Sequence, residues 1–321
     1  MVGWVKMKNL ILLESSQTFP YSMRVVLTNL SNKLYEQSRF RLNDSALKHG
    51  IKEIKSFDFE DLKAFPFYEE NKKILQAPKG IGYWLWKPFI ILQAMKEISE
   101  GDIIIYADCG IEIIDSLDPL ISICRKDNPV LLFANENLKN RFWTKRDCFV
   151  IMHCDEKKYW DGLQSDASFS LFRKSPQAEI FLNEWLNYCR DERVVSGNPN
   201  VCGKKNFFGF KEHRWDQSVL SLLAIKHDVE LFRVPTQYGN HYKLPELRIS
   251  GEFNCVNQVH QKQVNFYSSR PYRNSHYYQL LSHHRTKANT GTVEKKLSIV
   301  QAILKSGRRR WGKTKRFLTR T

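Results

Sequence analysis

Residues 80–89 read GIGYWLWKPF, and residues 101–110 read GDIIIYADCG. The first stretch is a basic, aromatic loop, and the second is an apolar strand that ends in a carboxylate. Between them, apolar residues recur at helical spacing over residues 89–98, after Pro88 in a first turn, where a missing N–H is tolerated. Ligands of open α/β sheets bind beyond the carboxyl ends of the strands. Asp108 is therefore predicted to lie at a binding site.

The N-terminal part of the chain alternates between strand and helix patterns. We expect a strand at residues 23–28 that ends in a polar turn at 29–32, a helix at 34–49 ended by Gly50, and a strand at 51–57. This β–α–β order predicts a parallel pair and an α/β fold.

Further elements are expected later in the chain. The strands are at 103–107, 129–134 and 164–173, and the helices are at 178–188 and 216–227. The inner side of the helix at 178–188 is predicted to carry Ile180, Phe181, Trp185 and Leu186.

The composition excludes several classes of protein. A hydrophobic content of 42% and an aromatic content of 13% over 321 residues exclude a mainly disordered chain. No apolar run has the length of a membrane span or of a signal-peptide core, so a cytoplasmic location is expected. The seven cysteines form no CxxC pair, which argues against a disulfide framework or a structural zinc site and favours buried thiols.

Positive charge is concentrated at the C-terminal end. Residues 295–321 contain ten Lys or Arg and no acid, which leaves +6 of the net charge of +16 for residues 1–294. Apolar residues among these cations at 297–321 are typical of a basic amphipathic segment on an anionic membrane, and a disordered, solvated tail is the alternative.

Two acidic residues are the candidates for chemistry. Asp108 could hold Mg²⁺ or Mn²⁺ that neutralises a diphosphate leaving group, or it could cap the following loop. Glu112 and Asp115 could be second ligands or solvated acids. Asp216, within the HRWDQS motif of residues 213–218, could act as a base for an acceptor hydroxyl or serve as a first-turn acid of its helix.

Cations and aromatic rings near the first motif could bind phosphate and a sugar or a base. Lys87 supplies a point charge for phosphate, and the rings of Tyr83, Trp84 and Trp86 could stack on a ligand. The tryptophans could instead anchor the loop in the core. Lys145 is a second candidate for phosphate, with a surface lysine as the alternative.

His241 is a candidate metal ligand, with a structural role as the alternative. The chain contains no P-loop, no Gly-x-Ser-x-Gly and no His-Glu-x-x-His motif. A dinucleotide site is also disfavoured, because the glycines of residues 80–82 lack the third glycine of that fingerprint.

Four motifs occur in a characteristic order along the chain. They are GIGYWLWKP at residues 80–88, GDIIIYADCG at 101–110, WTKRD at 143–147 and HRWDQS at 213–218. Together they resemble a group of bacterial and viral glycosyltransferase-like proteins, which are similar to nucleotide-diphospho-sugar transferases of the GT-A fold. In that group a GYWxWKP loop precedes a strand ending in Tyr-x-Asp, and an Asp-Gln-Ser helix follows later.

The resemblance implies a single Rossmann-like α/β domain over residues 23–285, with a mostly parallel central sheet flanked by helices. Residues 1–22 would be an N-terminal extension, and residues 286–321 would be the basic tail. By position, Asp108 would hold Mn²⁺ or Mg²⁺, and Asp216 would lie on the sugar or acceptor side.

The resemblance also assigns contacts to the nucleotide sugar. The residues implied for this role are Thr28, Asn29, Gly82, Tyr83, Trp84, Lys87 and Lys145. One departure stands out, because Asp-Cys-Gly at residues 108–110 replaces the Asp-x-Asp of the group. The second metal ligand is therefore not assigned.

These observations predict a glycosyltransferase that moves a sugar from a nucleotide-diphosphate donor to an acceptor hydroxyl in surface polysaccharide or lipopolysaccharide synthesis. One alternative is a basic nucleic-acid-binding protein, which ranks lower because the charge is concentrated in the tail. The other is a catalytically silent glycosyltransferase-like scaffold, since Gly110 replaces the second acid. The acceptor would be a glycan or a lipid-linked acceptor. Residues 297–321 would make a peripheral contact with the inner face of the membrane.

Overall fold

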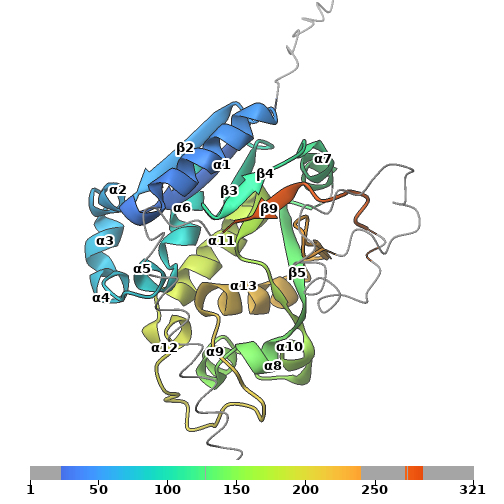
Figure 1. Cartoon of the computed structure of the whole chain (residues 1–321). Coiled ribbons are helices and arrows are strands. Elements are labelled where there is room, and N and C mark those ends of the chain that lie inside the picture. The colour runs from blue at the N-terminus through green and yellow to red at the C-terminus, as the bar shows by residue number, and fades with distance from the viewer. Residues whose placement is uncertain (1–22, 127, 240–271, 273, 285–321) are drawn as a thin grey trace, which may run out of the picture.

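The computed structural model describes residues 23–126, 128–239, 272 and 274–284, and Figure 1 shows them in colour. Within these ranges a seven-stranded sheet has the order β2-β1-β3-β7-β5-β6, with β8 beside β5. Its strands are β1 (Val25–Ser31), β2 (Glu53–Asp58), β3 (Ile103–Ala107), β5 (Val130–Lys139), β6 (Leu163–Ser165), β7 (Phe169–Arg173) and β8 (Leu231–Arg233). Strands β6 and β7 run opposite to the other five. A separate pair joins β4 (Ile111–Ile113) to β9 (Leu281–His283).

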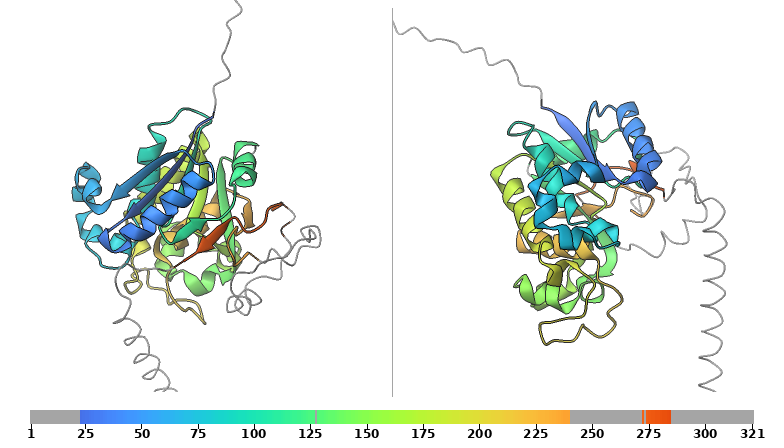
Figure 2. Two further views of the ribbon diagram at one scale, coloured as in Figure 1. Left: turned by 45° about the horizontal axis from the view of Figure 1, so that its top comes forward. Right: turned by 90° about the vertical axis from the view of Figure 1, so that its left-hand side faces the viewer.

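Helices cover both faces of the sheet. On one face lie α1 (Glu36–Lys48) and α7 (Asp118–Lys126), and on the other lie α6 (Trp86–Met95), α11 (Pro176–Cys189) and α13 (Trp215–Lys226). In the right-hand view of Figure 2, α1 (blue) and α11 (yellow-green) lie on opposite sides of the strands. The predicted α/β fold with a mostly parallel, helix-flanked sheet is confirmed.

Shorter helices connect these elements. They are η1 (Lys33–Tyr35), α2 (Phe59–Lys63), α3 (Pro66–Glu70), α4 (Lys72–Leu75), α5 (Gly80–Tyr83), α8 (Asn140–Trp143), α9 (Arg146–Ile151), α10 (Lys157–Asp161) and α12 (Glu192–Val195). No helix in the described ranges combines the length and the apolar character needed to cross a bilayer. The predicted segments 1–22 and 286–321 lie outside the described residues.

Strand β3 lies at the centre of the sheet, and all five of its residues are buried. Ile103, Ile105 and Ala107 pack on the α1 side, whereas Ile104 and Tyr106 pack on the α6 side. Because side chains alternate along a strand, a residue after Ala107 continues the Tyr106 side. This alternation directs Asp108 toward α6.

The first strand is longer than predicted. It continues through the expected turn to Ser31, in register with β2 as far as Asp58. Asn29 is buried inside the strand and donates from Nδ2 to Asn43 Oδ1 at 2.9 Å. Its neighbour Thr28 donates to the Lys55 carbonyl at 3.0 Å. Hydrogen-bonded polar side chains are compatible with a buried strand, so the predicted turn at residues 29–32 is wrong.

Two further predictions are also wrong. The expected strand at 164–173 is two strands, because the Asp166 side chain accepts from Ser168 N at 2.8 Å and forms a turn between β6 and β7. Ile180 was placed on the inner side of α11 but is 60% exposed, whereas the other three predicted residues are buried. In contrast, five of the six described cysteines are buried free thiols, as predicted.

The glycine-rich motif forms a left-handed helical turn. Five successive residues, 80–84, have φ between +51° and +83°. Tyr83 N donates to Lys79 O at 2.7 Å, and Trp86 Nε1 donates to Gly80 O at 3.0 Å. Each non-glycine residue in this conformation is disfavoured by about 1–2 kcal/mol. The turn leads directly into α6 and so determines where Lys87 enters the core.

Replacing Gly82 with alanine tests whether the turn needs glycine. A Cβ at Gly82 would lie 2.6 Å from Leu75 Cα, whereas a Cβ at Gly101 would meet nothing within 4 Å, although both residues have positive φ. We expect Gly101→Ala to lower the free energy of unfolding by about 1 kcal/mol and Gly82→Ala to lower it by about 3 kcal/mol. Urea denaturation measures both, and equal losses would contradict the close packing.

Candidate active site

The site is organised around the ammonium group of Lys87, in the first turn of α6. Lys87 Nζ lies 3.3 Å from Asp108 Oδ1, 3.1 Å from Asp216 Oδ2 and 2.8 Å from the Ala167 carbonyl. Lys87 Nζ thus donates a hydrogen bond to the Ala167 carbonyl and forms ion pairs with the two carboxylates. Lys87 thereby brings together the two predicted catalytic residues, which come from the end of β3 and the start of α13.

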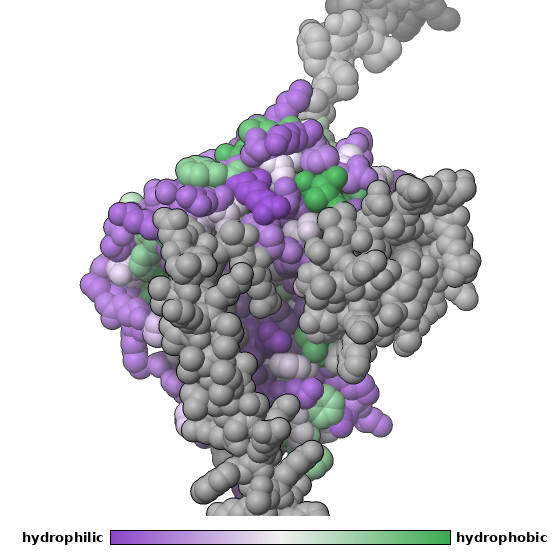
Figure 3. Space-filling view, in the orientation of Figure 1, coloured by the Kyte–Doolittle hydropathy of each residue, from purple (hydrophilic) through white to green (hydrophobic). Residues whose placement is uncertain are grey.

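Asp108 is the member of this group that is most open to a ligand. Its side chain is 35% exposed, against 3% for Lys87 and 5% for Asp216. The Tyr106 hydroxyl donates to Asp108 Oδ1 at 2.5 Å and fixes the carboxylate. Figure 3 shows a recessed, hydrophilic surface near the centre of this face, where α13 lies in Figure 1. Tyr106 was not among the site residues predicted from the sequence. Its spacing of two residues from Asp108 was a signal, because residues two apart on a strand lie on the same face.

One cation and two carboxylates share this enclosed space. Burial raises the pKa of Asp216 to about 7; Lys87 opposes the increase, and Asp108 adds to it. Burial also lowers the pKa of Lys87, but the two carboxylates outweigh it, and the net pKa is raised. Burial and the Asp108 charge raise the pKa of Tyr106. Near neutral pH, Lys87 is charged, Tyr106 is a neutral donor and Asp216 titrates.

The variant Asp216→Asn tests this titration. Because the folded-state pKa of about 7 lies above the ordinary 3.8, the folded wild type binds more protons between these values. This contribution to wild-type stability is therefore present at low pH and is lost as the pH rises from about 4 to about 7. We expect the stability of Asp216→Asn relative to wild type to increase between about pH 5 and about pH 8, as measured by urea denaturation.

Asp155 provides the control for this prediction. Burial raises the pKa of Asp155, but hydrogen bonds from Lys204 and Arg146 outweigh this effect, and the net pKa is lowered. Asp155 is therefore ionised throughout the same interval, and the stability of Asp155→Asn relative to wild type should stay constant. A constant difference for Asp216→Asn as well would show that Asp216 does not titrate there.

The residues implied for the nucleotide lie in two places. Thr28 and Asn29 are fully buried within β1, whose carboxyl end is Ser31. Gly82, Tyr83 and Trp84 lie in the left-handed turn. Their contacts with a nucleotide remain predictions, because no structural observation tests them.

The aromatic residues beside the turn have different roles. Trp86 is buried and anchors the turn in the core, as the alternative interpretation predicted. Trp84 is half-buried, and its ring lies 5.4 Å from the ring of Trp215, which precedes Asp216. Lys79 Nζ lies 4.3 Å from the centre of the Trp215 ring. The segments that carry Lys87 and Asp216 are thus joined by an aromatic contact.

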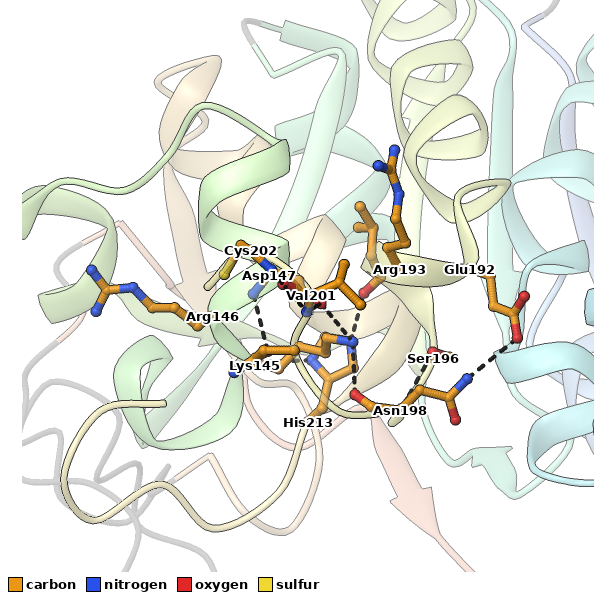
Figure 4. A network of polar contacts seen from close by, with 12 residues as sticks. Lys145, Arg146, Asp147, Glu192, Arg193, Ser196, Asn198, Val201, Cys202 and His213 are labelled. Carbon is orange, nitrogen blue, oxygen red and sulfur yellow. Dashed lines mark hydrogen bonds and ion pairs between the residues drawn. The ribbon is translucent and has the colours of Figure 1, made fainter. Parts of the chain in front are cut away.

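Lys145 is buried, so the surface-lysine interpretation is wrong. Its Nζ lies 3.3 Å from Asp147 Oδ2 and donates to the Asn198 carbonyl at 2.9 Å. Figure 4 shows these side chains converging between α9 and the loop that follows α12. A phosphate contact by Lys145 remains a prediction, and its ammonium group is directed at protein acceptors.

The buried ion pair continues into a hydrogen-bond network (Figure 4). Asp147 accepts from the backbone N–H groups of Val201 and Cys202 at 2.8–2.9 Å. His213 Nδ1 accepts from Lys145 N at 3.2 Å, and His213 Nε2 lies 2.9 Å from the Val194 carbonyl. Burial and the Lys145 charge lower the pKa of His213 to about 3, so it is neutral. His213 therefore holds the loop rather than serving the Lys87 site.

The described residues do not form a divalent metal site by themselves. No group of three His, Cys, Asp or Glu side chains among them could hold a metal ion. Asp108 Oδ1 already faces Tyr106 and the Lys87 ammonium, which disfavours a cation there. His241 lies outside the described residues. A metal site that includes Asp108 and His241 is therefore still a prediction.

The positions near Asp108 explain why no second acid lies beside it. At Gly110, just before β4, a Cβ would lie 3.0 Å from the carbonyl of His284, just after β9. The pairing of these strands therefore leaves little room for a side chain at position 110. Glu112 pairs instead with Arg41 of α1, and Asp115 is exposed. Neither acid joins the Lys87 group.

Comparisons with known proteins find no family model and no curated protein that match this chain. Among solved structures, the chain is similar to mouse xyloside xylosyltransferase 1 in its apo form, at 12% identity and a TM-score of 0.41 over 84% of this chain and 98% of that one. It is similar to the bifunctional glycosyltransferase WbbM at 12% identity and a TM-score of 0.45, over 83% of this chain and 46% of that one. It is also similar to the galactosyltransferase LgtC in complex with donor and acceptor sugar analogues. The identity is 13% and the TM-score is 0.38, over 81% of this chain and 87% of that one. At these TM-scores, the similarities assign no activity to this chain.

Proposed function

We propose that this chain is a glycosyltransferase that moves a sugar from a nucleotide-diphosphate donor to an acceptor hydroxyl. The observation that supports the proposal is the Lys87 group, at the carboxyl edge of β3. Strands β2 and β3 flank β1 on opposite sides, so the chain reverses its order there, and ligands of such sheets bind at this reversal. The sequence motifs that resemble nucleotide-sugar transferases supply Lys87, Asp108 and Asp216, which meet there.

Each residue of the group has a proposed role. Asp108 accepts a hydrogen bond from a sugar hydroxyl, since it is the exposed carboxylate and is fixed by Tyr106. Asp216, with a pKa near neutrality, accepts the proton of the acceptor hydroxyl when that group comes within hydrogen-bond distance. Lys87 holds both carboxylates, and its charge offsets the negative charge of a departing diphosphate.

The finer parts of the proposal rest on sequence patterns alone. The acceptor would be a glycan or lipid-linked sugar in surface polysaccharide or lipopolysaccharide synthesis. The basic segment 297–321 would place the enzyme at the inner face of the membrane. Mn²⁺ or Mg²⁺ at Asp108 would assist the diphosphate, with a ligand such as His241 from outside the described residues.

Substitution of the two carboxylates tests the catalytic assignment. We expect Asp108→Asn and Asp216→Asn each to lower kcat for sugar transfer at least a hundredfold, because an amide cannot act as a base or carry the negative charge. The exposed neighbour Asp115→Asn should retain wild-type transfer. Circular dichroism verifies the fold of each variant. Wild-type rates in both site variants would exclude these residues from catalysis.

A thermal-shift screen tests the donor class and the metal. Ligands that bind only the folded state raise Tm, so UDP, GDP, CDP and CMP are compared with and without Mn²⁺. We expect one nucleoside diphosphate to raise Tm, and Asp108→Asn to reduce the part of that shift that requires Mn²⁺. A shift that requires Mn²⁺ would support the metal site, and an unchanged Tm with all four nucleotides would contradict the proposed donor.

A further inference from the structure

The loop between α12 and α13 carries the most exposed apolar side chains of the described residues. Phe208 is 101% exposed and Val201 is 67% exposed. Figure 1 shows this loop at the lower end of the molecule, beside α8 and α9. Single apolar residues are common on folded surfaces, so the case for a docking site depends on the fixed conformation and the charges of this loop.

The loop is held in place at several points, so the exposure of Phe208 follows from a defined conformation. Gly209, next to Phe208, has φ +82°, and a Cβ there would lie 3.1 Å from the Phe142 ring. Lys211 N donates to the Phe142 carbonyl at 2.9 Å, and Arg146 N donates to Asn206 Oδ1 at 2.7 Å. The buried Asp147 network holds the other side of the loop (Figure 4).

Exposed lysines flank Phe208 in the sequence, at three residues on either side. Lys205 and Lys211 are exposed, and within the described ranges no carboxylate lies at ion-pair distance from either. The neighbouring helix α10 begins with the exposed Lys157 and Lys158, and the rings of Trp160 and Phe207 pack at 5.0 Å to join α10 to the loop. Lys211 Nζ lies 5.2 Å from the centre of the Trp143 ring, which leaves its charge without a carboxylate partner among the described residues. An aromatic ring flanked by such lysines is complementary to a surface that is apolar inside and anionic outside.

We propose that the loop tip, defined as Val201, Lys205, Phe208 and Lys211, docks on an anionic lipid surface. Phe208 inserts at the boundary between headgroups and acyl chains, and the lysines face the headgroups. The loop continues directly into Trp215 and Asp216 of α13, so it adjoins in sequence the segment that carries one carboxylate of the Lys87 group. This proposal adds a second membrane contact to the one proposed for residues 297–321, and its test needs neither donor nor acceptor.

Sedimentation of the full-length protein with lipid vesicles tests the proposal. We expect binding to vesicles of phosphatidylcholine with phosphatidylglycerol and much weaker binding to phosphatidylcholine alone. Phe208→Ser should lower the partition coefficient about tenfold, through loss of apolar burial. Lys205→Glu and Lys211→Glu should each lower it about fivefold or more.

Matched substitutions outside the loop provide the controls. Phe40 of α1 is 57% exposed, and Lys52 and Lys126 are exposed with no ion pair to a described residue. Phe40→Ser, Lys52→Glu and Lys126→Glu should bind vesicles less strongly than wild type by twofold at most. All of these substitutions are on the surface, and circular dichroism verifies the fold of each variant.

Three outcomes would overturn the proposal. The first is equal vesicle binding by loop and control variants, which would assign binding to other residues, such as 297–321. The second is no binding of wild type to either vesicle. The third is a Phe208→Ser variant that changes the sedimentation coefficient in the absence of lipid but not vesicle binding, which would identify a protein–protein surface. Vesicle binding is measured without sugar transfer, so failure here leaves the proposed activity to its own tests.

Discussion

The ion pairs of Lys87 are the constraint on which the rest of the site depends. A buried ammonium group is strongly unfavourable unless carboxylates compensate it, and removal of one partner of a buried pair typically costs about 3–5 kcal/mol. Lys87 from α6 meets this requirement with Asp108 after β3 and Asp216 in α13. The consecutive elements α6 and β3 and the distant helix α13 are therefore held together by one charge. Burial raises the pKa of Asp216 to about 7, against the opposing effect of Lys87.

Backbone strain is concentrated in the segments that deliver these groups. Trp84 (φ +61°) lies three residues before Lys87, and Trp215 (φ +47°) lies immediately before Asp216. Strained conformations persist only where surrounding contacts stabilise them, and they cluster at functional sites. Here the contacts are the Trp84–Trp215 ring pair and the Trp86 hydrogen bond to the turn. The strain therefore supports the interpretation of this region as a functional site rather than a connecting loop.

The second buried lysine, Lys145, holds a surface loop in place. Lys145 pairs with Asp147 and hydrogen-bonds Asn198, and together with neutral His213 it holds the loop that carries Phe208. Both lysines that the sequence suggested for phosphate are thus directed at protein acceptors. For Lys87 the neighbouring Asp108 is exposed and a ligand can meet the pair, whereas the side chain of Asp147 is fully buried. The first pair organises a reactive site, and the second organises a surface.

Local sequence determined the elements whose signals are short-range. Apolar residues at 103–107 predicted β3, helical spacing predicted α6 and α13, and the acid after β3 was placed at the edge of the sheet. Tertiary structure alone decided where polar side chains find partners. Asn29 stays inside β1 because Asn43 accepts its hydrogen bond, and Lys145 is buried because Asp147 compensates its charge. Periodicity reports which side of an element is apolar, but the partners that stabilise a buried charge come from distant segments, and only the folded chain brings them together.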